Sequence, residues 1–213
     1  MARRHGPAIA IVDGDADSAQ IAEFERDRRD LLRRGIAAGG AAVAASSIPL
    51  LLSVRNAFAA QSGDLGIVEH AITLERVAVL AYDTLLGGGL LDPSVTRVVK
   101  LFRGHEQQHV DALVAAMTAL RGAVPAKPSG VKDIDAVVKG IGDVKSQADV
   151  IGFAIELETA AVAAYLDAHR NLRDAGLLQT SATIMADEGQ HLVVLRLAAD
   201  TPPVPNAFET GKK

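Results

Sequence analysis

The sequence of 213 residues contains no cysteine and no tryptophan, and it has only two tyrosines and five phenylalanines. Without cysteine the chain can form no disulfide, no iron–sulfur cluster and no zinc site with thiolate ligands. Scarce aromatic residues beside many alanines, leucines and valines favour helices over a β-sandwich. The formal net charge of −4 argues against nucleic acid as a partner. The composition therefore predicts a helical protein without sulfur-based metal chemistry.

We interpret residues 1–59 as a targeting segment rather than as part of the fold. The stretch Arg28-Arg29-Asp30-Leu31-Leu32-Arg33 resembles the twin-arginine signal of proteins that are exported already folded. A Gly/Ala-rich run follows over residues 36–54, and Ala57-Phe58-Ala59 has the pattern of a cleavage site. Glycines and a proline in the run suit a signal better than a permanent membrane span, although an uncleaved signal would act as a membrane anchor. We expect residues 60–213 to form the domain that reaches the periplasm or cell envelope through machinery for folded proteins.

Four segments of this domain repeat apolar residues at alternating steps of three and four, as amphipathic helices do. They cover about residues 64–86, 92–120, 147–172 and 177–199. The apolar stripe of the first segment begins at Leu65, and that of the second ends at Leu120. Short connections follow the first and third segments, whereas residues 122–146 form a long Gly/Pro-containing stretch with a short helix expected at 131–138. This order predicts an all-α, antiparallel four-helix bundle with a long crossover between the second and third helices.

Each apolar stripe is interrupted near its middle by residues that can bind metal. They are Glu75 in the first helix, Glu106 and His109 in the second, Glu158 in the third, and Glu188 and His191 in the fourth. Four carboxylates buried in one core would repel each other and would either be strongly destabilising or take up protons. Two divalent cations would neutralise them, and a Glu from each of two helices with Glu-x-x-His from the other two is the ligand set of dimetal bundles. We predict that these six residues are metal ligands.

An internal repeat supports the same ligand set. The aligned segments are Ile72–Tyr82 with Ile155–Tyr165, and His105–His109 with Asp187–His191. The sequence His-Glu-Gln-Gln-His also matches the motif in which two histidines of a zinc protease hold one ion. In the repeat, however, Asp187 stands in place of His105. The shared element is Glu-x-x-His with the glutamate as a ligand, and we therefore reject the zinc-protease interpretation.

With these motifs the chain resembles the ferritin-like superfamily, and within it the bacterial ferritin-like group that includes desiccation-related proteins. The Leu-Glu pairs of the first and third helices, both Glu-x-x-His motifs and the tail Pro203-Val204-Pro205-Asn206-Ala207-Phe208-Glu209 carry the resemblance. Members of the superfamily include iron-storing ferroxidases, peroxide-reducing proteins, manganese catalases and proteins without a known activity. The resemblance therefore implies a fold and a metal site more than a reaction.

Further residues could influence the metals through the ligands. In many relatives an Asp precedes the glutamate of each Glu-x-x-His motif. Asp187 fits this pattern as an acceptor for the ring N–H of a ligating histidine, whereas His105 departs from it. Tyr82 and Tyr165 lie seven residues after a predicted ligand, and we favour a role as core aromatics whose hydroxyls reach a partner over a role as metal-proximal hydrogen-bonding or redox residues.

The resulting hypothesis is an exported protein with two divalent metal ions. Hard oxygen ligands suit both iron and manganese, and we place iron ahead of manganese. The protein would oxidise metal or reduce O₂ or peroxide, in iron handling or in protection against oxidative stress; no residue is assigned a catalytic role. The alternative is a non-enzymatic envelope protein in which the metals neutralise the glutamates and hold the bundle together. An open path for O₂ or peroxide would favour the enzyme, and a sealed site would favour the alternative. A homo-oligomer is compatible with either.

Overall fold

The computed structural model describes residues 63–211, so the predicted signal segment lies outside the described residues. The helices are α3 (Asp64–Gly87), α4 (Pro93–Ala119), α5 (Val131–Asp135), η1 (Ile141–Asp143), α6 (Gln147–His169) and α7 (Ala175–Ala198). No strand occurs in this part of the chain, and the predicted all-α class is confirmed. The observed helix ends differ from the expected ones by three residues or fewer. None of the helices in residues 63–211 combines the length and apolar character needed to span a bilayer.

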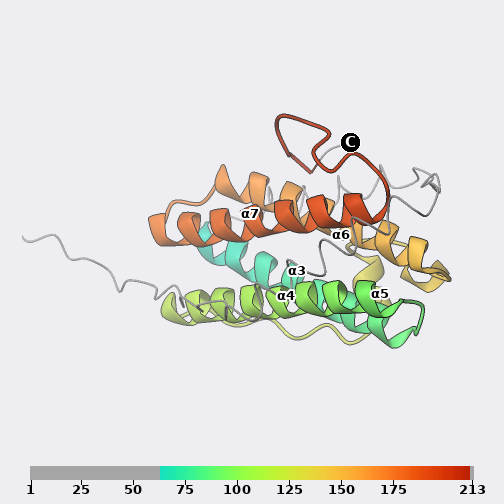
Figure 1. The fold of residues 1–213 in the computed structure, drawn as a ribbon. Helices are drawn as coiled ribbons and strands as arrows, with labels where there is room; N and C mark the ends of the chain where they lie inside the picture. The colour runs from blue at the N-terminus through green and yellow to red at the C-terminus, as the bar shows by residue number, and fades with distance from the viewer. Residues whose placement is uncertain (1–62, 212–213) are drawn as a thin grey trace, which may run out of the picture.

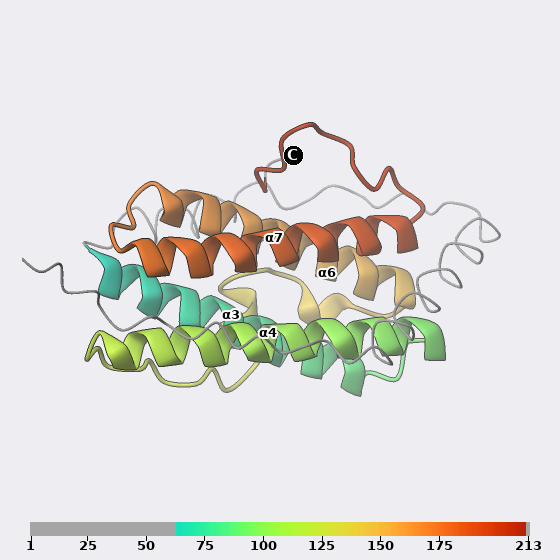
Figure 2. The same cartoon turned by 60° about the vertical axis from the view of Figure 1, so that its left-hand side comes forward.

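The four long helices form two hairpins that pack against each other. Helix α3 lies along α4, and α6 lies along α7 (Figure 1). The hairpins meet through contacts of α3 with α6 and of α4 with α7. Residues 120–146 run along the bundle from one end to the other and include α5 and η1 (Figure 2). The predicted bundle with a long crossover between its second and third helices is therefore confirmed.

The start of α4 shows how local sequence fixes the helix ends. The Asp92 carboxylate accepts hydrogen bonds from the backbone N–H groups of Ser94 and Val95 at 2.9 and 3.0 Å, and Pro93 occupies a first-turn position that needs no N–H donor. Asp92 also joins two helices. Its N–H donates to Gln147 Oε1 at 2.8 Å, and Gln147 Nε2 donates to Asp92 Oδ2 at 3.2 Å. The first turns of α4 and α6 are thus held together.

The bundle interior has two apolar clusters with a polar layer between them. One cluster gathers the second half of α3, the first halves of α4 and α6 and the end of α7. The other gathers the opposite halves of the same helices. The expected apolar stripes were wrong at two of their outermost positions, since Leu65 is 46% and Leu120 is 37% exposed. The predicted metal ligands lie in the polar layer, with apolar side chains packed on both sides.

We expect Asp92→Ala to lower the free energy of unfolding by about 1–2 kcal/mol, because the first turn of α4 loses its acceptor. Asp92→Asn keeps an acceptor oxygen and is the matched control, with a smaller expected loss. Urea unfolding followed by circular dichroism measures both. Equal losses in the two variants would contradict the role of the side-chain oxygen as a helix cap.

Candidate metal centre

The structure brings all six predicted ligands together at the middle of the bundle. Their side chains come from all four long helices, namely Glu75 from α3, Glu106 and His109 from α4, Glu158 from α6, and Glu188 and His191 from α7. Each of them is 9% exposed or less. The four carboxylates and two imidazoles are therefore almost completely removed from water.

The six side chains form two groups of possible ligands that share two glutamates. One group is Glu75, Glu106, His109 and Glu188; the other is Glu106, Glu158, Glu188 and His191. In each group, one ligand atom per residue lies within 4.8 Å of the others. Glu106 and Glu188 belong to both groups, so the two groups are neighbours that share a pair of carboxylates.

The Nδ1 atoms of His109 and His191 face the glutamate carboxylates of the centre. His109 Nδ1 lies 3.2 to 3.5 Å from oxygens of Glu75, Glu106 and Glu188. His191 Nδ1 lies 3.3 to 3.4 Å from oxygens of Glu106, Glu158 and Glu188. Charged hydrogen bonds between nitrogen and oxygen are shorter, at about 2.7–2.9 Å. The observed separations instead suit ligand atoms that share an ion at bond lengths of about 2.1 Å.

Several of these atoms are buried and have no hydrogen-bond partner among the described residues. They are Glu106 Oε1, both carboxylate oxygens of Glu188, and Nδ1 of His109 and His191. Buried polar atoms are nearly always paired in folded proteins, and each one left unpaired costs about 1–3 kcal/mol. A cation between them would satisfy these atoms together. The donor set, with oxygen and imidazole ligands only, therefore fits divalent transition-metal ions.

Burial also changes the charges at the centre. It raises the pKa of Glu75, and burial together with the charge of Glu188 raises the pKa of Glu158 to about 8. Burial alone would lower the pKa of His109 and His191, but the surrounding carboxylates raise both well above their ordinary value. The centre thus holds protons that a bound cation would displace, which makes metal binding weaker at low pH.

Both tyrosines of the chain contact the centre. The Tyr82 hydroxyl donates to Glu158 Oε1, and the Tyr165 hydroxyl donates to Glu75 Oε1. Burial, followed by the charge of the neighbouring glutamate, raises the pKa of each tyrosine, so the hydroxyl stays a donor. Both residues are buried core aromatics, as favoured, but their hydroxyls bond to predicted ligands, which is the hydrogen-bonding role that was ranked second. The signal was in the internal repeat, since equal spacings on antiparallel helices bring each tyrosine to the glutamate of the other helix.

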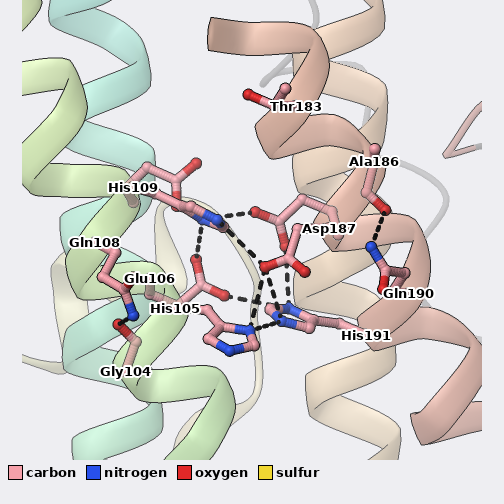
Figure 3. A network of polar contacts seen from close by, with 12 residues as sticks. Gly104, His105, Glu106, Gln108, His109, Thr183, Ala186, Asp187, Gln190 and His191 are labelled. Carbon is pink, nitrogen blue, oxygen red and sulfur yellow. Dashed lines mark hydrogen bonds and ion pairs between the residues drawn. The ribbon is translucent and has the colours of Figure 1, made fainter. Parts of the chain in front are cut away.

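Asp187 faces the outer nitrogens of the same imidazole rings. Its Oδ2 atom lies 3.4 Å from Nε2 of both His109 and His191 (Figure 3), so it reaches two rings where the sequence suggested one. His105 Nδ1 lies 3.2 Å from Asp187 Oδ2 and 2.9 Å from His191 Nε2. The histidine that departs from the family pattern therefore contacts both a predicted ligand and its carboxylate partner.

Removing one tyrosine hydroxyl tests how far the centre depends on these contacts. We expect Tyr165→Phe to weaken Co²⁺ binding about 10–100-fold, because Glu75 loses the donor that orients it. Competition with a chromophoric chelator measures the affinity. Thr159→Val is the matched control, since it removes a buried hydroxyl of α6 that bonds to the Ile155 carbonyl at 2.6 Å and not to the centre. Equal affinities of Tyr165→Phe and the wild type would contradict this role.

Comparison with known proteins agrees with this architecture. Residues 63–201 match the family model described as ferritin-like domain. The structure is similar to the crystal structure of a conserved hypothetical protein from Mycobacterium tuberculosis, with a TM-score of 0.56 over 74% of this chain and 99% of that one. The sequence identity is 16%, so this likeness concerns the fold alone. The sequence has no match among curated proteins. On the family match, which spans all four long helices and every predicted ligand, the chain belongs to the ferritin-like domain family.

Proposed function

We propose that the protein holds a dinuclear iron or manganese centre and uses it to oxidise metal or to reduce O₂ or peroxide. The observation that carries the proposal is the sharing of Glu106 and Glu188 between two ligand groups, each completed by one further glutamate and one histidine. Four carboxylates balance the charge of two divalent ions, and oxygen-rich ligands suit iron and manganese. We place iron ahead of manganese as the bound metal. The purpose that we propose is iron handling or protection against oxidative stress.

The side chains around the centre would prepare it for this chemistry. A reduced metal pair, when bound, supplies the electrons for O₂ or peroxide. Tyr82 and Tyr165 orient the two glutamates that are not shared, and Asp187 orients both imidazole rings from outside. The apolar clusters on both sides of the polar layer keep water away from the ligands. The chain thus fixes the ligand atoms before an ion arrives, which reduces the reorganisation needed for binding and for reaction.

One observation favours the alternative of a non-enzymatic metal-binding protein of the cell envelope. The ligands are almost fully buried, and a sealed centre would neutralise the glutamates and hold four helices together without turning over a substrate. The partly exposed side chains of His105 and Asp187, which contact the imidazole ligands, favour access from solvent. We therefore keep the oxidoreductase as the leading proposal.

Metal analysis of the purified protein is the first test. We expect about two iron or manganese ions per chain, and a loss of both in Glu106→Ala/Glu188→Ala, because the shared glutamates serve both ions. Glu156→Ala is the matched control, since it removes a carboxylate of α6 that belongs to neither ligand group. A wild-type protein that folds but binds no metal would overturn the proposal.

Turnover separates the enzyme from the alternative. The iron-loaded protein should consume O₂ or peroxide when Fe²⁺ is supplied, and the double variant should not. Thermal unfolding with and without metal gives the complementary measurement. A large metal-dependent rise in Tm without any turnover would favour the structural role.

We further propose that the chain is exported by the twin-arginine route and belongs with the desiccation-related group; both proposals rest on sequence alone. Replacing Arg28 and Arg29 by lysine should retain the protein in the cytoplasm, because the pair is the recognised feature of such signals. The matched control replaces the other arginine pair, Arg3 and Arg4, by lysine. Cell fractionation measures both, and unchanged localisation of the first variant would contradict the route.

A further inference from the structure

We propose that His105, Asp187 and the outer nitrogen of His191 form a third metal site, at the surface between α4 and α7, that accepts divalent transition-metal ions and passes them to the buried centre. The inference deepens the proposed function and rests on it, since a loading site needs a centre to load. Figure 3 shows the three side chains together between the two helices.

The separations of the three donor atoms suit a single ion. His105 Nδ1 and His191 Nε2 are 2.9 Å apart, and Asp187 Oδ2 lies 3.2 Å from the first and 3.4 Å from the second. Atoms at these spacings can all lie about 2.1 Å from one ion. The three residues meet the geometric requirement of a metal site, and they share with the buried groups only His191, which offers Nε2 here and Nδ1 to the glutamates.

Exposure places this site on the way from solvent to the centre. The side chains of His105 and Asp187 are 30% and 27% exposed, whereas that of His191 is 1% exposed. Asp187 Oδ2 lies 3.4 Å from His109 Nε2 as well as from His191 Nε2. Both rings present Nδ1 to the glutamates on their other side. Donor atoms therefore follow one another from the surface between α4 and α7 to the shared glutamates.

Ring stacking holds His191 in position for both sites. Its ring stacks on Phe102 with the centroids 3.9 Å apart and on His105 with the centroids 5.2 Å apart. Phe102 is buried, so the stack is anchored in the apolar cluster. The ring plane is thereby fixed with one nitrogen facing the buried carboxylates and the other facing His105 and Asp187.

The chemistry of the three residues suits uptake rather than storage. Mixed nitrogen and oxygen donors select transition-metal ions over calcium and magnesium, which prefer oxygen alone. The surface site has one carboxylate, whereas each buried group has three. An ion should therefore be held less strongly at the surface, and transfer to the centre is favourable. His105 makes this site possible, because it supplies a second imidazole where the internal repeat has Asp187.

Co²⁺ titration of the full chain tests the proposal, with the visible absorption bands and equilibrium dialysis as readouts. The wild type should bind two ions tightly and a third more weakly, because the third ion must displace the Nε2 proton of His191 to solvent while Nδ1 of the same ring holds a buried ion. His105→Ala should lose the third ion and fill the buried centre about tenfold more slowly in stopped-flow mixing, because its entry ligand is gone. His105→Asp restores a donor at this position and should keep the third ion. Gln108→Ala, at an exposed position of the same helix turn, is the matched control and should behave as the wild type.

The outcomes distinguish the two proposals. Two results would contradict the third site and leave the dinuclear centre standing. In the first, His105→Ala binds three ions and fills its buried centre at the wild-type rate. In the second, every variant binds at most two ions and fills its buried centre equally fast. If the wild type binds no more ions than Glu106→Ala/Glu188→Ala, the proposed function fails and the loading site fails with it. Loss of the third ion in His105→Ala together with its retention in His105→Asp supports the surface site.

Discussion

The burial of four carboxylates in an apolar bundle is the constraint on which the rest of this structure depends. Bringing one such group out of water is costly, and bringing four together adds repulsion between like charges. The surrounding chain compensates in three ways: each glutamate faces an imidazole, two of them accept a tyrosine hydroxyl, and all four belong to groups that could hold a cation. The polar layer is therefore costly to the metal-free fold and is compensated when cations bind.

The two apolar clusters and the polar layer depend on each other. Packed apolar side chains lie on both sides of the largely buried ligands, and the low polarity of these surroundings strengthens every interaction inside the layer. The tyrosines belong to both parts, since their rings fill the apolar clusters and their hydroxyls end in the layer. Each also crosses from one helical hairpin to the other. The same side chains thus pack the core, join the hairpins and orient ligands.

Much of this could be predicted from sequence because the signals are local. Asp92-Pro93 marks a helix start whatever surrounds it, and glutamates in otherwise apolar stripes stand out by residue type alone. The internal repeat gave both tyrosines the same spacing from a glutamate, but the contact itself also depends on how α3 and α6 are offset along the bundle, which the crossover and packing decide. The exposure of Leu65 and Leu120 depends on where neighbouring helices stop covering them. Asp187 reaches two rings instead of one because α4 and α7 approach at that level, which helical periodicity does not encode.

Each ligand group draws on both hairpins, and this has a consequence for assembly. The first hairpin, α3 with α4, supplies Glu75, Glu106 and His109, but lacks Glu188, and the second hairpin is incomplete in the same way. During synthesis, a nascent chain that has folded only its first hairpin has three of the six possible ligands and completes neither group. Capture of metal would therefore report that the second hairpin has docked. For a chain that leaves the cytoplasm after folding, as we propose, a fully coordinated cation would mark a molecule whose two hairpins have already docked.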